Sequence, residues 1–161
     1  TLKKVDTKNN STSLETNNNL IKNLKYDMNF DDNTKYKITA GLSEIKYING
    51  VEIVEMQTVT AIFIDKDNVP LNITSKNATY NNSNYNTKFA NNVKVTYLSN
   101  IILSERLDVD FNENIINIYE NVVYEGLQGM IKADNVVLNL ITKNMKIFML
   151  NDKEKVEISS K

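Results

Sequence analysis

Carboxylate pairs are the residues in this sequence whose type and spacing could support chemistry. Asp108 and Asp110 lie two residues apart in an apolar-alternating stretch, and Asp65 and Asp67 lie two apart in a polar stretch. Paired carboxylates can act as general acid and general base. Solvated strand faces and turns place carboxylates at the same spacing, which is the simpler interpretation. We therefore expect no catalytic residue and no enzyme.

Metal, cofactor and nucleic-acid chemistry have little support in the composition. The chain of 161 residues has no His and no Cys, so it lacks the usual general base and metal ligand and all thiol chemistry. The acidic segments 31–33 and 65–68 lack the full ligand pattern of a calcium loop. Lys plus Arg number 19 and Asp plus Glu number 20, so no basic excess points to nucleic acid. We expect no metal and no cofactor.

A repeat of 29 residues organises the stretch from Leu71 to Leu150. Within each unit the matched apolar positions are mostly two residues apart, which is typical of strands with one buried face. This pattern predicts four short strands in each unit, which in the middle unit are Ile101–Glu105, Leu107–Phe111, Ile115–Tyr119 and Val122–Glu125. The residues that coincide are Ile73, Ile102 and Ile131, then Tyr80, Val109 and Leu138, then Phe89, Ile118 and Ile147.

The chain before the repeat divides into a polar segment and further hairpins. Residues 1–19 are rich in Asn, Ser and Thr, and we expect a flexible tail or tether there. Apolar alternation then predicts a hairpin of Leu24–Met28 with Tyr36–Ala40, and Asn49-Gly50 is a strong hairpin turn signal. Residues 20–161 are thus predicted to form one all-β domain.

Two interpretations fit the apolar face that these strands share. It is either the interdigitated core of a β-sandwich or a slot for an elongated apolar guest. Small residues recur on this face and would leave room between sheets: Ala40, Ser75, Ser104 and Ala133.

Several segments resemble the LptC family, the periplasmic component of the lipopolysaccharide export bridge of Gram-negative bacteria. They are Leu24–Ala40, Asp65–Tyr80 and Phe89–Val95, with Ile102–Phe111 and Gly129–Leu140 as further OstA/LptA-like units. The resemblance implies a twisted, open, V-shaped β-jellyroll of stacked antiparallel hairpins. It also implies a lipopolysaccharide carrier in the periplasm, anchored to the inner membrane by a segment preceding Thr1. Few glycines occupy the turns, which departs from the family pattern.

The resemblance also implies where ligand and partners bind. Lipid acyl chains would occupy a groove, and lipopolysaccharide would pass from the inner-membrane ABC transporter (LptB, LptF and LptG) at the N-terminal edge to LptA at the C-terminal edge. The expected edge residues are Leu24, Tyr26 and Met28 at one end and Met145, Ile147 and Met149 at the other. The expected groove residues are Ile38, Ile73, Tyr80, Phe89, Val95, Ile102, Val109, Ile118, Ile131, Leu138 and Ile147.

Three alternatives remain at this point. A soluble LptA-like bridge protein would share the repeat and the groove. A carbohydrate-binding β-sandwich would need exposed aromatic platforms, which the 8 Tyr residues could supply. A structural β-solenoid would have a closed interior and take up no lipid.

Overall fold

The computed structural model of the chain describes residues 5–10, 19–149 and 155–159, with side chains described for residues 19–149. Every helix or strand in these ranges is a β-strand, so the all-β fold class predicted from the sequence is confirmed. The strands are β1 (Val5–Asn10), β2 (Leu20–Asn29), β3 (Lys35–Ile48), β4 (Val51–Ile64), β5 (Leu71–Asn81), β6 (Thr87–Tyr97), β7 (Asn100–Asp110), β8 (Ile115–Gly126), β9 (Gly129–Asn139), β10 (Asn144–Phe148) and β11 (Lys155–Ser159).

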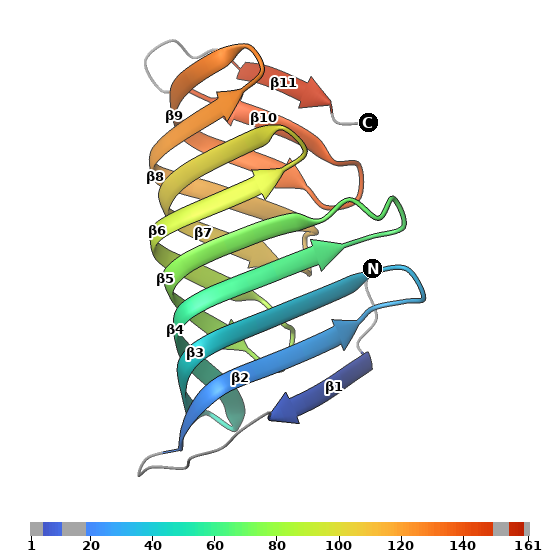
Figure 1. Cartoon of the computed structure of the whole chain (residues 1–161), viewed down its shortest axis with the longest axis vertical. Coiled ribbons are helices and arrows are strands. Elements are labelled where there is room, and N and C mark those ends of the chain that lie inside the picture. Colours follow the sequence, from blue (N-terminus) through green and yellow to red (C-terminus); the bar gives the residue numbers. More distant parts are fainter. Residues whose placement is uncertain (1–4, 11–18, 150–154, 160–161) are drawn as a thin grey trace.

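Each strand pairs antiparallel with its neighbours in sequence, so the sheet order runs from β1 to β11 without a crossover. The sheet does not close on itself; it doubles over along one side, as Figure 1 shows. This is the twisted, open β-jellyroll that the family resemblance implies. The strands β5, β7 and β9 begin at residues 71, 100 and 129, so one 29-residue repeat is one pair of long strands.

The doubled sheet has two walls, which we name from Figure 1. The front wall contains the half-strands that meet at turns 30–34, 65–70, 98–99 and 127–128. The rear wall contains the half-strands that meet at turns 49–50, 82–86, 111–114 and 140–143. Each of the strands β3 to β9 contributes one half to each wall. The apolar core lies between the walls.

The two walls join at a corner where the strands bend. The ladder of paired residues shifts there, between Thr74 and Asn77 in β5 and between Tyr119 and Val122 in β8. A bulge of this kind turns the chain while both halves stay in one sheet. The prediction of four short strands per unit is therefore wrong: Ile115–Tyr119 and Val122–Glu125, for example, are the two halves of β8.

Residues with left-handed backbone make the corner on alternate strands. Asn23 in β2 has a φ of 54°, Thr58 in β4 has 57°, Asn92 in β6 has 54° and Asn121 in β8 has 56°. Asn adopts this conformation more readily than other non-glycine residues. Three of these four corner positions are therefore occupied by Asn.

The outermost strands cover two strands that the sequence assigned to partners. Val5–Asn10, within the segment predicted to be a flexible tail, is strand β1 and pairs with Leu24–Asn29 of β2. At the other end, Lys155–Ser159 is β11 and pairs with β10. Pairing uses backbone groups that every non-proline residue carries, so a polar sequence can provide a strand without an apolar pattern.

Candidate functional site

The residues predicted to line a groove all point into the space between the walls. Ten of the eleven are buried and Ile131 is half-buried. Residues of opposite parity, such as Thr74, Lys88, Lys94 and Lys132, are exposed on the outer faces. The predicted division into an apolar inner face and a polar outer face is confirmed.

This inner face is packed in the structure. The ten buried residues of the predicted groove are between 0 and 3 % exposed. Protein interiors at this burial are filled by side chains and leave few voids larger than water. The predicted groove residues therefore form the closed core between the two walls.

Two of the small residues of the inner face lie at the corner. Ser75 Oγ donates a hydrogen bond to the carbonyl of Asn77 at 2.7 Å, and Ser104 Oγ donates to the carbonyl of Arg106 at 3.1 Å. These serines satisfy backbone oxygens in the bulge, where the paired ladder shifts. Their recurrence after 29 residues thus reflects the geometry of the bend as well as the space between the walls.

Contacts across the open side hold the front wall to the rear wall. The ring of Tyr26 in the front wall stacks on Tyr80 in the rear wall, with centroids 4.9 Å apart. The Tyr26 hydroxyl donates to Glu52 at 3.3 Å. Burial, followed by the nearby Glu52 carboxylate, raises the pKa of Tyr26 well above its ordinary value. This tyrosine stays protonated and donates its hydrogen bond across the opening.

Phe111 in the rear wall is the centre of an aromatic cluster from the front wall. Its ring centroid lies 4.9 Å from that of Phe30, 4.9 Å from that of Tyr36 and 6.3 Å from that of Phe63. Tyr36 also donates to the Thr87 hydroxyl in the rear wall at 2.8 Å, and burial raises the pKa of Tyr36 well above its ordinary value. Aromatic pairs of this kind add to the stability gained from burial alone.

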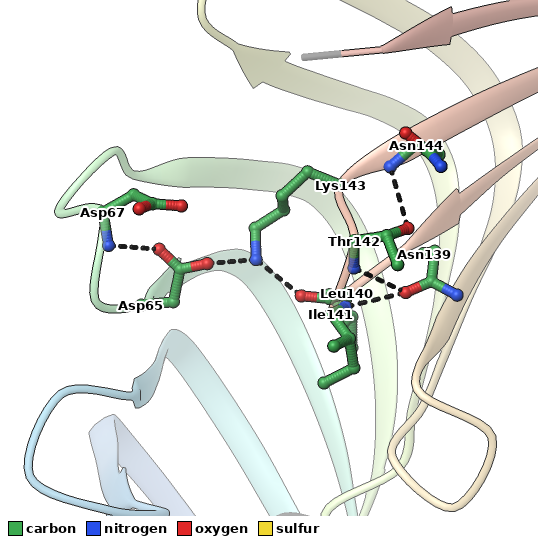
Figure 2. Close-up of polar contacts among 8 residues, drawn as sticks. All are labelled: Asp65, Asp67, Asn139, Leu140, Ile141, Thr142, Lys143 and Asn144. Atoms are coloured by element: carbon green, nitrogen blue, oxygen red, sulfur yellow. Dashed lines mark hydrogen bonds and ion pairs between the residues drawn. The ribbon is translucent and has the colours of Figure 1, made fainter. Parts of the chain in front are cut away.

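An ion pair joins the walls next to this cluster (Figure 2). Lys143, in the β9–β10 turn of the rear wall, bonds Asp65, in the β4–β5 turn of the front wall. Lys143 Nζ also donates to the Leu140 carbonyl at 2.5 Å and lies 5.6 Å from the centroid of the Phe63 ring. Lys143 is only 7 % exposed. Between these turns lies a cavity of about 220 Å³.

The rear-wall turns of the repeat share one design, which the sequence predictions missed. An Asn or Asp side chain opens each turn by accepting a hydrogen bond from a backbone N–H two residues on. A residue with left-handed backbone closes each turn. The signal was present in the repeat, because both positions recur every 29 residues: Asn81, Asp110 and Asn139 open the turns, and Tyr85, Asn114 and Lys143 close them.

The carboxylate pairs have structural partners. Asp108 accepts a hydrogen bond from the Tyr119 hydroxyl at 3.3 Å and lies 3.7 Å from Lys88 Nζ. Asp110 accepts the N–H groups of its own turn. Asp65 accepts the N–H of Asp67 at 2.9 Å. These acids hold turns and strand pairs in place, and across the described ranges the acidic residues form no cluster that could hold a metal ion.

The tyrosines form no exposed platform for a sugar ring. Of the eight, all of which lie between residues 19 and 149, only Tyr47 is exposed. Six are buried in the core and Tyr119 is half-buried on the outer face. Stacking on sugars needs accessible aromatic faces, so this arrangement disfavours the carbohydrate-binding alternative.

The predicted partner residues lie one strand in from each end of the sheet. Leu24, Tyr26 and Met28 are buried on β2, beneath the pairing with β1. Met145 and Ile147 are buried on β10, and β11 pairs along that strand. Met149 follows β10 and is half-buried. Their role as partner contacts stays a prediction.

Comparisons with known proteins agree with the fold. The sequence model of the family described as "LptC: Lipopolysaccharide-assembly, LptC-related" matches residues 2–149. The matched range spans β1 to β10 and includes every residue of the inner face discussed above. Comparison with curated proteins finds no match. In the part of the chain that the structure describes, no helix has the length and apolar character to cross a membrane.

Proposed function

This chain belongs to the LptC family and has a role in lipopolysaccharide transport, and from that premise we propose that it carries lipopolysaccharide with the acyl chains of lipid A between its two walls. The observation that supports this most directly is the continuous apolar inner face, which runs through every repeat unit from Ile73 to Ile147. No charged clamp is required for such a ligand.

The energetics suit a carrier. Each buried methylene contributes roughly 0.8 kcal/mol, so one acyl chain of about a dozen carbons contributes on the order of 10 kcal/mol. Part of this gain is offset, because the walls must give up their contacts with one another. The net affinity is therefore lower than the gross burial suggests, and a ligand held by non-directional contacts can leave again.

We propose that the protein acts in the periplasm, held at the inner membrane by a segment preceding Thr1. Lipopolysaccharide would arrive from the ABC transporter formed by LptB, LptF and LptG at the N-terminal end of the sheet and leave to LptA at the C-terminal end. The outermost strands β1 and β11 offer backbone groups for strand addition. The inner faces of neighbouring proteins would then form one continuous apolar path.

Photo-crosslinking at adjacent residues tests this function. Val109 points between the walls and is 3 % exposed, whereas the next residue, Asp108, lies on the outer face. A photoreactive side chain at Val109 is expected to capture lipopolysaccharide, and the same group at Asp108 is not. Capture at Asp108 without capture at Val109 would overturn the proposal. Ile131, which is half-buried on the same inner face, is a second inner position that tolerates a bulky probe more easily.

A further inference from the structure

We infer that Asp65 and Lys143 form a latch across the open side of the fold, and that lipid enters the inner face only when this ion pair separates. The inference rests on the proposed function, because it concerns access to the same inner face. It assigns to two residues the control of when the walls part.

The environment of the pair makes it a strong contact. The side chains of Lys143 and Asp65 are only 9 % and 12 % exposed. Other ion pairs, such as that of Lys46 with Glu55, have side chains 41 % and 52 % exposed. Exposed pairs contribute little because water and salt screen them, whereas breaking a pair away from water is costly.

The position of the pair makes it a latch rather than a local brace. Asp65 follows β4 and Lys143 precedes β10, and these strands are far apart in the sheet order. The pair therefore joins walls that no backbone ladder joins at this point. The adjoining cavity of about 220 Å³ is lined by Phe63, Leu140 and Ile141 together with the pair itself. The turns already stand apart there, and three apolar side chains line the gap beside polar and charged ones.

The charges around the cavity argue against an anion site at Lys143. Asp31 and Asp65 line the cavity together with Lys66 and Lys143, so positive charge has no excess. A phosphate group that approached Lys143 would meet two carboxylates. The arrangement instead suits a lysine whose charge is balanced by a carboxylate of the protein, and this pairing is lost only when the walls separate.

Covalent closure of the latch tests the inference. The chain has no Cys, so the double variant D65C/K143C carries the only two thiols and can be linked with a short, reducible bismaleimide. The probe is cis-parinaric acid, a fluorescent fatty acid, and the readout is its rate of uptake. Linking is expected to slow uptake by about tenfold or more, because it removes the open state to which the ligand binds. Reduction of the linker is expected to restore the rate.

A matched control uses an ion pair within one wall. Lys46 and Glu55 lie on β3 and β4, which pair directly in the rear wall. The variant K46C/E55C, linked with the same reagent, is expected to take up the probe at its unlinked rate. A linked D65C/K143C protein that takes up the probe at its unlinked rate would overturn the latch and leave the proposed function intact. Equal slowing in both linked proteins would also overturn it, because the effect would not depend on crossing the walls.

A second variant decides the matter if the double variant fails to fold. D65N removes the charge and keeps the size of the side chain, so it is expected to speed uptake severalfold by weakening the closed state. Unchanged uptake by D65N would overturn the latch. If the unmodified chain takes up no probe, and the chain with a photoreactive side chain at Val109 captures no lipopolysaccharide, the proposed function is overturned and the latch with it.

Discussion

Thr58 is strained by the corner, and replacing it should stabilise the protein. It is an exposed residue within β4 with a φ of 57°, a conformation that β-branched residues very rarely adopt. Left-handed backbone costs a non-glycine residue about 1–2 kcal/mol, and Asn pays less of this cost than Thr. The substitution loses no buried surface, and the lower strand propensity of Asn costs a fraction of 1 kcal/mol. We expect Thr58→Asn to raise the free energy of unfolding by about 0.5–1 kcal/mol.

The matched control lies two residues further along the same strand. Thr60 is also exposed, but it is extended and paired with Thr39 and Thr74. Thr60→Asn therefore relieves no strain and should lower stability by about 0.5 kcal/mol through strand propensity alone. Urea denaturation measures the midpoint of each variant, and the midpoints report stability directly if the dependence of the unfolding free energy on urea concentration is the same for both. If both substitutions move the midpoint downward by the same amount, the corner stores no strain at Thr58 and the reasoning fails.

Two further predictions concern the contacts across the open side. Phe111→Ala should lower the free energy of unfolding by about 3–5 kcal/mol, because it leaves a cavity among three rings. The control Phe148→Ala changes a residue that is 37 % exposed, so it should lower the free energy of unfolding much less. Similar urea midpoints for the two variants would contradict the central role of Phe111. Tyr36→Phe should cost about 1 kcal/mol at neutral pH by removing the bond to Thr87. Burial raises the pKa of Tyr36 above 10.0, so its stabilisation is complete below pH 10 and is lost above it, where unfolded tyrosine ionises. Unfolding measured between pH 8 and pH 11 should thus show a shallower alkaline loss in Tyr36→Phe, and equal slopes would refute this assignment.

The sequence was sufficient to predict which face of each strand is buried. In β5 the apolar and small positions at Ile73, Ser75, Ala78 and Tyr80 are spaced by two residues, then three, then two, and all four are buried. The single step of three marks the bulge, where one extra residue shifts the alternation. A phase change that keeps the same residue types on one face is thus visible in the order of residues alone.

The number of strands was not predictable in the same way. The polar residues Glu120 and Asn121 suit either a tight turn or a bulge, because both structures can contain left-handed backbone. Only the pairing with β9 distinguishes them: Tyr119 lies opposite Asn135 and Val122 opposite Ala133, so β8 continues along the same neighbour. Register is a property of two strands, and the sequence of one strand does not contain it.

The repeat does not predict which residues contact each other across the two walls. The period relates Lys143 to Asn114 and Tyr85, which occupy equivalent turns, but its partner Asp65 precedes the repeat. Strand β1 was not predicted for another reason: its pairing with β2 requires only backbone groups, and its sequence shows no apolar pattern. The sequence predicts the individual hairpins well. It does not predict how sharply the sheet bends, and therefore which hairpins contact each other across the two walls.

Because each 29-residue unit carries its own bend and its own turn, the domain can change size by duplication or loss of a whole unit. A duplicated unit would add two strands, one further section of each wall and one further bend that continues the corner. The length of the apolar inner face, which we propose holds acyl chains, would then grow in fixed steps. Genetic change at this level would alter reach without disturbing the sections already in place.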